Sequence, residues 1–247
     1  MRDEVRVLPL RGIPELEKGD DLGALLVAAA AAGGGFEPGD VLVVAQKAVS
    51  KVEGRVVYLS DVEPSAKARE LAGEEDARRM EVILRESSEI LRTRAPLLIA
   101  ETKHGFVCAS AGVDASNAKG PDTLVLLPLD PDASARRLRD RVRELSGVEV
   151  GVIVSDSFGR AWRRGTTDVA LGVSGIAPLL DLKGERDSVG YELHATEIAV
   201  ADEIAGAAEL VMGKTEGIPG AIVRGIDAAG DGSGQDLLMP RERDLFR

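Results

Sequence analysis

Residues 152–168 combine side chains that can act on phosphates and carboxylates. Asp156 and Ser157 follow an apolar run typical of a buried strand, and α/β proteins usually bind ligands at the carboxyl end of such a strand. The oxygens of these two side chains are hard donors, which suit Mg²⁺ or Mn²⁺. An alternative is that Asp156 caps a helix. Three arginines follow: Arg160, Arg163 and Arg164. Their planar guanidinium groups can donate two hydrogen bonds to a phosphate or carboxylate, and the alternative is that they are simply exposed on the surface.

Two further segments carry polar groups of the same kind. Asp114 and Asn117 lie in the glycine-containing loop 111–117, where Asp can bind a cation and Asn can hold a phosphate or a base edge. Alone, such residues are more often turn formers. The apolar run 41–45 is followed directly by Gln46, Lys47 and Lys51. Two aspartates, a hydroxyl and several cations at strand ends together favour metal-assisted phosphate chemistry.

Several better-known site patterns are missing. Gly213, Lys214 and Thr215 resemble the end of a P-loop, but Ala208 stands where its first glycine belongs and the segment follows a predicted helix. The chain has neither a dinucleotide-binding glycine fingerprint after a strand nor a nucleophile elbow. With two histidines and one cysteine, the sequence also excludes a multi-cysteine zinc site and disfavours a histidine-rich one.

The elements that must position these residues alternate along the chain. Apolar runs with turn signals between them predict strands, and periodic stretches with capping residues predict helices. Residues 96–147 read as a β-rich middle, so we expect one mixed α/β unit over 1–247, with 1–95 plus 148–247 as an α/β part. The predicted strands are 5–10, 41–45, 56–59, 96–100, 106–109, 124–129, 148–155 and 221–224; the predicted helices are 22–32, 64–92 (one broken or two adjoining), 131–146 and 196–212.

Composition and charge favour a folded globular protein over a nucleic-acid-binding or membrane-spanning one. The chain has 247 residues with a formal net charge of −11, which argues against a nucleic-acid-binding surface spread over the molecule. Its 44% hydrophobic content suits a folded globular protein. The longest apolar run, 24–32, is far shorter than the roughly 20 residues that cross a bilayer. We see no leader segment, and we expect a soluble, cytoplasmic protein with small-molecule partners and no membrane contact.

Five motifs in the same order resemble the coenzyme F420-0:L-glutamate ligase (γ-glutamyl ligase) family. The likeness runs over nearly the whole chain, and five ordered motifs are far more specific than any one of them. Some members of the family carry an appended flavin-reductase-like domain, which we do not expect here. The matching segments are 8–15 with 19–22, 39–54, 111–117, 155–163 and 197–203.

The resemblance implies a GTP-dependent, amide-forming acid–amino-acid ligase. Such an enzyme joins the carboxylate of a deazaflavin phospholactate, F420-0, to the amine of L-glutamate and then extends a γ-linked tail. The γ-phosphate of GTP activates the carboxylate as an acyl phosphate, and the amine displaces phosphate. The resemblance also implies an α+β fold with a mixed sheet flanked by helices, an intertwined homodimer, two divalent ions (Mg²⁺ or Mn²⁺) and K⁺ as a candidate monovalent cation.

Roles carry over residue by residue. Asp114 and Asp156 are expected to bind one divalent ion, and Ser157 a second. Relatives tend to have Gln where Lys214 stands, and an ammonium group has no lone pair with which to bind a metal. From charge and position alone, Arg160 and Arg163 join the two aspartates as catalytic candidates. The expected GTP contacts are Ile13, Pro14, Glu15, Leu16, Gln46, Lys51, Asn117, Met212, Gly213, Lys214, Thr215, Glu216, Gly217, Ile218 and Pro219.

Two other functions stay open at this point. One is a phosphotransferase, or a nucleotide-using ligase for a different carboxylate, that shares the metal and phosphate groups. The other is a non-catalytic nucleotide-binding or scaffold protein whose helical region 64–92 recruits partners. Glutamate-dependent release of phosphate from GTP separates the ligase from the first, and metal-stimulated turnover separates it from the second.

Overall fold

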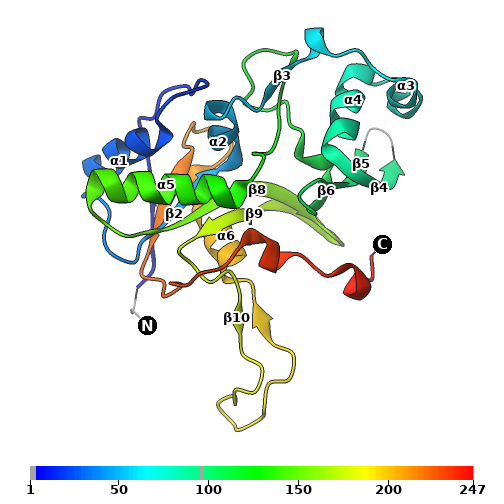
Figure 1. Cartoon of the computed structure of the whole chain (residues 1–247). Coiled ribbons are helices and arrows are strands. Elements are labelled where there is room, and N and C mark those ends of the chain that lie inside the picture. Colours follow the sequence, from blue (N-terminus) through cyan, green and yellow to red (C-terminus); the bar gives the residue numbers. More distant parts are fainter. Residues whose placement is uncertain (1–3, 95–96, 247) are drawn as a thin grey trace.

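A five-stranded mixed sheet forms the centre of the computed structural model, which describes residues 4–94 and 97–246 (Figure 1). The strand order is β1-β12-β2-β8-β9, and β2 and β8 are the parallel pair while the other neighbours are antiparallel. The central strands are continuous apolar runs because both faces are covered. The strands are β1 (Arg6–Pro9), β2 (Val41–Ala45), β8 (Gly151–Arg160), β9 (Arg163–Ser174) and β12 (Gly220–Arg224).

Helices cover both faces of this sheet, which confirms the expected mixed α/β class with flanking helices. One face packs against α1 (Leu22–Ala32) and α5 (Pro131–Ser146), and the other packs against α6 (Val200–Met212) (Figure 1). Asp130 caps the start of α5, and Gly147 ends it in the left-handed conformation, as the sequence predicted. The expected homodimer stays a prediction, because the structure describes one chain.

A second lobe is built from residues between β2 and α5. The buried core of this lobe contains side chains from Leu59 to Leu126, so the lobe includes segments on both sides of the boundary expected near residue 95. Helix α5, which lies within the range 96–147 expected to form a β-rich middle, packs on the main sheet. Residues 1–3, 95, 96 and 247, which fall within the expected boundaries, lie outside the described residues. The elements of this lobe are β3 (Val56–Tyr58), α3 (Ala66–Ala72), α4 (Ala77–Glu86), β4 (Ser87–Arg94), β5 (Leu97–Thr102), β6 (Val107–Ala109) and β7 (Thr123–Val125), with the short turns η1 (Leu59–Asp61) and η2 (Ser110–Gly112).

The helical prediction for 64–92 is wrong in its last part. The region holds two helices, α3 and α4, but α4 ends at Glu86 and the chain continues as β4, which pairs with β5. Ser87 marks the change, because its hydroxyl donates to the carbonyl of Ile83 and its backbone is extended. Pairing with β5 thus overrides the helical spacing of Ile90.

Three other boundaries differ from the sequence-based expectation. The polar segment after β2 folds at once into α2 (Gln46–Val52). The strand predicted to end at residue 155 continues to Arg160, because β9 pairs with it along its whole length as a hairpin. The helix predicted from residue 196 begins at Val200, since Glu197 and Ile198 form β11 and pair with β10 (Leu180–Asp181) in an arm that projects from the body (Figure 1).

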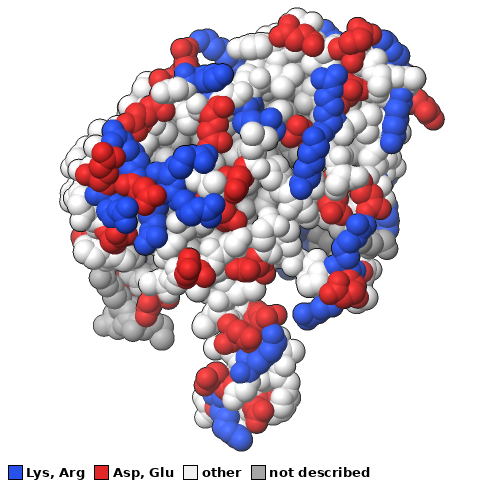
Figure 2. Space-filling model, viewed as in Figure 1, with Lys and Arg blue, Asp and Glu red and all other residues white. Residues whose placement is uncertain are grey.

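The C-terminal segment runs back across the molecule towards the second lobe. It contains the short turns η3 (Gly234–Leu237) and η4 (Arg241–Arg243). The carboxylate of Asp132 in the first turn of α5 accepts hydrogen bonds from Val173 N, Ser233 Oγ and Gly234 N, which joins the segment to the sheet. Charged side chains of both signs mix on the surface (Figure 2). No helix among the described residues is long and apolar enough to span a bilayer.

Candidate functional site

A cavity lies where β2 and β8 end, the position that parallel strand pairs usually give to ligands. The parallel ladder stops at the pair Ala45 and Ser155, and beyond it the chain turns into α2 on one side and into the β8–β9 hairpin on the other. The cavity is lined by Ile13, Pro14, Glu15, Leu16, Ala45, Gln46, Lys47, Ala48, Lys51, Asn117, Ser155, Asp156, Ser157, Asp168, Glu209, Met212, Gly213, Lys214, Gly217, Ile218 and Pro219.

Most of the residues expected to bind nucleotide meet in this cavity, although they come from four separate parts of the chain. All of the expected contacts from residues 13–16, α2, the loop at Asn117 and the segment 212–219 line it except Thr215 and Glu216, which are exposed beside it. Asp156 and Ser157 also line it. Asp114 does not line the cavity, but it contacts the cavity residue Lys47.

Lys47 connects the loop at Asp114 to the cavity. Its ammonium lies 2.6 Å from Asp114 Oδ2 and also donates to Ser116 Oγ. Burial by itself raises the pKa of the Asp114 carboxyl, but the Lys47 ammonium and the Ser116 amide and hydroxyl outweigh it and hold the pKa below its ordinary value. Asp114 is therefore ionised at neutral pH, and Lys47 and Ser116 contact both oxygens of its carboxylate.

Asp156 experiences the opposite balance. Burial raises the pKa of its carboxyl to about 6, and the neighbouring Asp168 charge adds to the rise, while the Ser157 amide, Lys47 and Lys214 oppose it. No side-chain donor hydrogen-bonds to this carboxylate within the part of the chain that the structure describes. A desolvated carboxylate beside a second one is a group whose charge a bound cation stabilises.

Two serine hydroxyls of β8 converge on one carboxylate of β9. Ser155 Oγ donates to Asp168 Oδ2 at 2.8 Å, and Ser157 Oγ donates to Asp168 Oδ1 at 2.6 Å. The Asp168 amide donates to Glu209 Oε2 of α6 at 3.1 Å. Asp168 is 5% exposed, so these bonds hold the floor of the cavity in one arrangement.

Some of the remaining polar side chains of the cavity form hydrogen bonds or ion pairs within the protein, and others do not. The buried Gln46 accepts from Ser50 Oγ at 3.0 Å through its Oε1, and its Nε2 has no hydrogen-bond partner among the described residues. Lys51 is ion-paired with Glu15 at 2.5 Å. Lys214 forms no ion pair with a carboxylate among residues 4–94 and 97–246, so its ammonium is free to meet an incoming anion.

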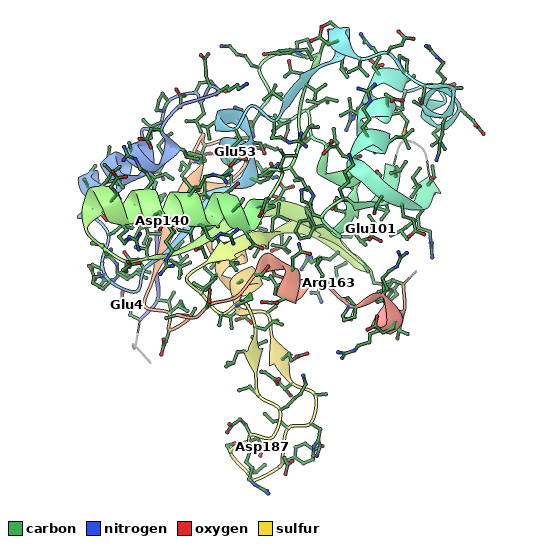
Figure 3. All side chains as sticks on the ribbon, viewed as in Figure 1. Glu4, Glu53, Glu101, Asp140, Arg163 and Asp187 are labelled. Atoms are coloured by element: carbon green, nitrogen blue, oxygen red, sulfur yellow. The ribbon has the colours of Figure 1, made fainter. Side chains whose placement is uncertain are left out.

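The arginines expected to act on substrate lie outside the cavity. Arg160 and Arg163 stand at the exposed turn of the β8–β9 hairpin, and Figure 3 shows Arg163 close to the C-terminal segment. Arg160 Nη2 donates to the backbone carbonyl of Arg164 at 3.3 Å. Their part in binding substrate stays a prediction.

Comparison with known proteins identifies the family. The family model described as F420-0:Gamma-glutamyl ligase matches residues 12–225. The chain belongs to the F420-0:γ-glutamyl ligase family. It is 43% identical to the coenzyme F420:L-glutamate ligase of Methanothermobacter thermautotrophicus over 98% of this chain and 99% of that protein. It is 48% identical to the protein of that name from Methanocaldococcus jannaschii over 86% of each, and 43% identical to the one from Archaeoglobus fulgidus over 98% and 96%.

The oxygen donors of this γ-glutamyl ligase family member fit Mg²⁺ or Mn²⁺ in chemical type. Asp156, Asp168 and Ser157 supply hard oxygens to the cavity, and Asp156 has no side-chain hydrogen-bond donor among the described residues. No group of three His, Cys, Asp or Glu residues in the described chain is arranged to hold a metal by itself. That fits ions that are bound by one or two carboxylates and complete their coordination with substrate phosphates.

Several cavity residues of this family member were not among the candidate site residues from its sequence, and Asp168, Glu209 and Lys47 are three of them. Asp168 lies opposite Ser157 in the register of the β8–β9 hairpin, and the carboxylate of Glu209 in α6 accepts from the Asp168 backbone amide. The signal for Asp168 was its place eleven residues after Ser157, because a predicted hairpin would have brought these two residues opposite each other. Lys47 was noted beside Gln46, but nothing in the spacing linked it to Asp114. Glu209 carried no local signal.

Proposed function

We propose that this protein is a GTP-dependent ligase that joins L-glutamate to the carboxylate of coenzyme F420-0 and extends the γ-linked glutamate tail. Its family, and relatives at 43–48% identity that are named coenzyme F420:L-glutamate ligase, support this activity. The observation that carries the proposal is the cavity at the ends of β2 and β8, where three lysines face a set of oxygen donors.

The reaction we propose has two steps. A carboxylate oxygen of F420-0 attacks the γ-phosphorus of GTP, the bond to the β-phosphate oxygen breaks, and an acyl phosphate and GDP form. The amine of glutamate then attacks the acyl carbon, the carbon–oxygen bond to phosphate breaks, and the nitrogen loses a proton as the amide forms. The energy of GTP is thus used to turn a carboxylate oxygen into a leaving group.

The first step demands positive charge, which the three lysines of the cavity supply only in part because four acidic residues line it as well. Two anions must meet, and unit charges 4 Å apart repel by about 4 kcal/mol at the effective dielectric of a protein surface. Lys214 is free of carboxylate partners in the described part of the chain, and Lys47 and Lys51 line the same wall. Their ammonium groups stabilise developing charge on the transferred phosphoryl group.

Other residues have binding and positioning roles in this proposal. Gln46 lines the cavity and its buried Nε2 is a donor without a partner in the described chain, while Ser50 fixes the amide by donating to its oxygen. Asp114 and Asp156 would hold one divalent ion and Ser157 a second, with K⁺ as a candidate monovalent cation. When bound, these ions would add positive charge at the phosphate oxygens. Asp168 orients Ser157 through the bond between their side chains.

The test is direct synthesis. The protein is incubated with GTP, Mn²⁺, L-glutamate and F420-0, and the mass of the product is measured by mass spectrometry. We expect additions of one or more glutamate residues together with equimolar phosphate and GDP. Release of phosphate from GTP that does not depend on glutamate, or ligation to a different carboxylate in preference to F420-0, would refute the proposal. Asp156→Asn should abolish metal-dependent turnover while the protein stays folded.

A further inference from the structure

The turn of the β8–β9 hairpin presents an unusual surface, which we call the arginine tip and define as residues 160–164. Trp162 lies at its end, is 86% exposed and is the only tryptophan of the chain. Its φ of +57° lies in the left-handed region, which is uncommon for a bulky residue. Its ring contacts Phe246 edge-on, with ring centres 4.7 Å apart. A large aromatic ring kept in solvent by a strained turn indicates a binding role.

The three arginines of the tip are free of acidic partners. In this acidic protein, arginines are commonly ion-paired with carboxylates, as Arg78, Arg137 and Arg141 are. Within the described residues, none of the arginines at positions 160, 163 and 164 forms such a pair, and all three are exposed. Three unpaired guanidinium groups around one aromatic ring make a surface suited to an anion that carries a flat ring.

The arginine tip is connected to the cavity by one continuous strand. Ser157 lines the cavity, and the turn begins three residues later in β8. At a rise of about 3.3 Å per residue, the tip begins roughly 10 Å from the cavity and its end lies roughly 17 Å away. A ligand whose reacting carboxylate sits beside Ser157 and whose ring lies at the far end of a flexible chain can span this distance.

We propose that the arginine tip binds the distal part of the deazaflavin substrate. Trp162 stacks on the flat deazaflavin ring, and the arginines bind the phosphate that lies between the ring and the reacting carboxylate. This inference rests on the proposed function. It gives the ring a site separate from the nucleotide cavity, and it explains why an exposed tryptophan stands among cations on the same hairpin that carries Asp156 and Ser157.

A second copy of the chain that meets this surface on a two-fold axis fits it less well than a ring-bearing anion does. On such an axis the tip faces itself, so three arginines would face three arginines. Like charges placed together in a contact are repulsive. A phosphate-bearing aromatic compound instead matches both the charge and the ring.

The single tryptophan makes the proposal directly measurable. All tryptophan emission of the protein comes from Trp162, so stacking of a deazaflavin ring on it should quench that emission. The full chain is titrated with F420-0 in the absence of GTP, where no turnover occurs. We expect saturable quenching by F420-0 that GTP alone does not produce. Emission that stays unchanged at F420-0 concentrations that saturate ligation would overturn the proposal.

Kinetics of variants separate a ring contact from a structural role. For Trp162→Ala we expect the KM for F420-0 to rise about tenfold, as for loss of one stacked base, while the KM values for GTP and glutamate stay unchanged. Trp162→Phe keeps a ring and should recover most of the loss. Arg163→Gln should raise the same KM and weaken its dependence on salt. Arg186→Gln, which removes an exposed charge from the projecting arm, is the matched control and should change none of these values.

The outcomes distinguish this proposal from the proposed function. If the wild-type protein does not ligate glutamate to F420-0, the proposed function fails, whereas the fluorescence titration still reports whether the ring binds at Trp162. If ligation proceeds and Trp162→Ala behaves like wild type, only the arginine tip proposal fails. An emission maximum that shifts to the blue with protein concentration, in the absence of ligand, would show that a second copy covers the ring and would also overturn it.

Discussion

Removal of the Asp168 carboxylate should destabilise the protein and impair the cavity together. Asp168 accepts hydrogen bonds from Ser155 and Ser157 and is almost fully buried. Hydrogen bonds to a charged group contribute about 1.5–3 kcal/mol each, so loss of the two serine bonds in Asp168→Ala should lower the free energy of unfolding by about 3–6 kcal/mol. Asp168→Asn keeps one acceptor oxygen and should lose about half as much.

The effect on catalysis should exceed the effect on folding for the asparagine variant. Asp168 orients Ser157, which faces the cavity, and loss of such a supporting contact commonly lowers metal affinity or activity by about 10–100-fold. Urea unfolding followed by circular dichroism gives the stability, and kcat/KM for glutamate ligation gives the activity. Asp202→Asn is the matched control, because Asp202 also binds β9, through Ala170 N at 2.9 Å, but does not line the cavity.

The asparagine variants at positions 168 and 202 should behave differently from each other. Asp202→Asn should lose some stability, about 1 kcal/mol for one weakened hydrogen bond, and keep normal kcat/KM. If Asp168→Asn keeps wild-type stability and wild-type kcat/KM, the two serine bonds neither stabilise the fold nor arrange the cavity. If both asparagine variants lose activity to the same extent, the loss comes from β9 as a whole and not from the cavity carboxylate.

Three other changes test the packing that carries the site. Arg224→Ala leaves the buried carboxylate of Asp40 without its two-pronged partner, both bonds of which are 2.8 Å, and should cost about 3–5 kcal/mol in urea unfolding. Gly172→Ala places a methyl group 2.2 Å from the Pro131 carbonyl carbon, where α5 meets β9, and should cost about 1–3 kcal/mol or more through overpacking. Burial raises the pKa of the Cys108 thiol to about 12, so thiol reagents at pH 8 should label the folded protein about a thousandfold more slowly than free cysteine, with the rate rising as the pH rises.

Each of these has a result that would contradict it. A loss below 1 kcal/mol for Arg224→Ala would mean that water reaches the Asp40 carboxylate when the arginine is removed. Wild-type stability of Gly172→Ala would show that α5 can move away from β9 without cost. Rapid labelling of Cys108 in the folded protein, at a rate unaffected by urea below the unfolding transition, would show that the thiol is neither buried nor protonated.

The local elements were predictable where one segment carries its own signal. The apolar run of β2 needs two covered faces wherever it is placed, and the Asp130 and Gly147 caps set both ends of α5. The family resemblance also supplied the expected GTP contacts, and most of those in residues 13–16 and 212–219 line the cavity. The helix predicted from local spacing was wrong at β4, where Ile90 has helical spacing but pairs with β5. A partner strand supplies backbone hydrogen bonds that local spacing does not reveal.

The sequence by itself determined the chemistry available to this protein: hard oxygens, lysines, arginines and one tryptophan in an acidic chain. Tertiary structure decided which of them meet. Lys47 and Asp114 are 67 residues apart and touch because β7 and α2 pack together, and Asp168 receives two serine hydroxyls because the hairpin register places it opposite Ser157. Charges interact through distances in space, so a carboxylate gains its partners, and its shifted pKa, only after strands and helices have brought distant segments within a few ångströms.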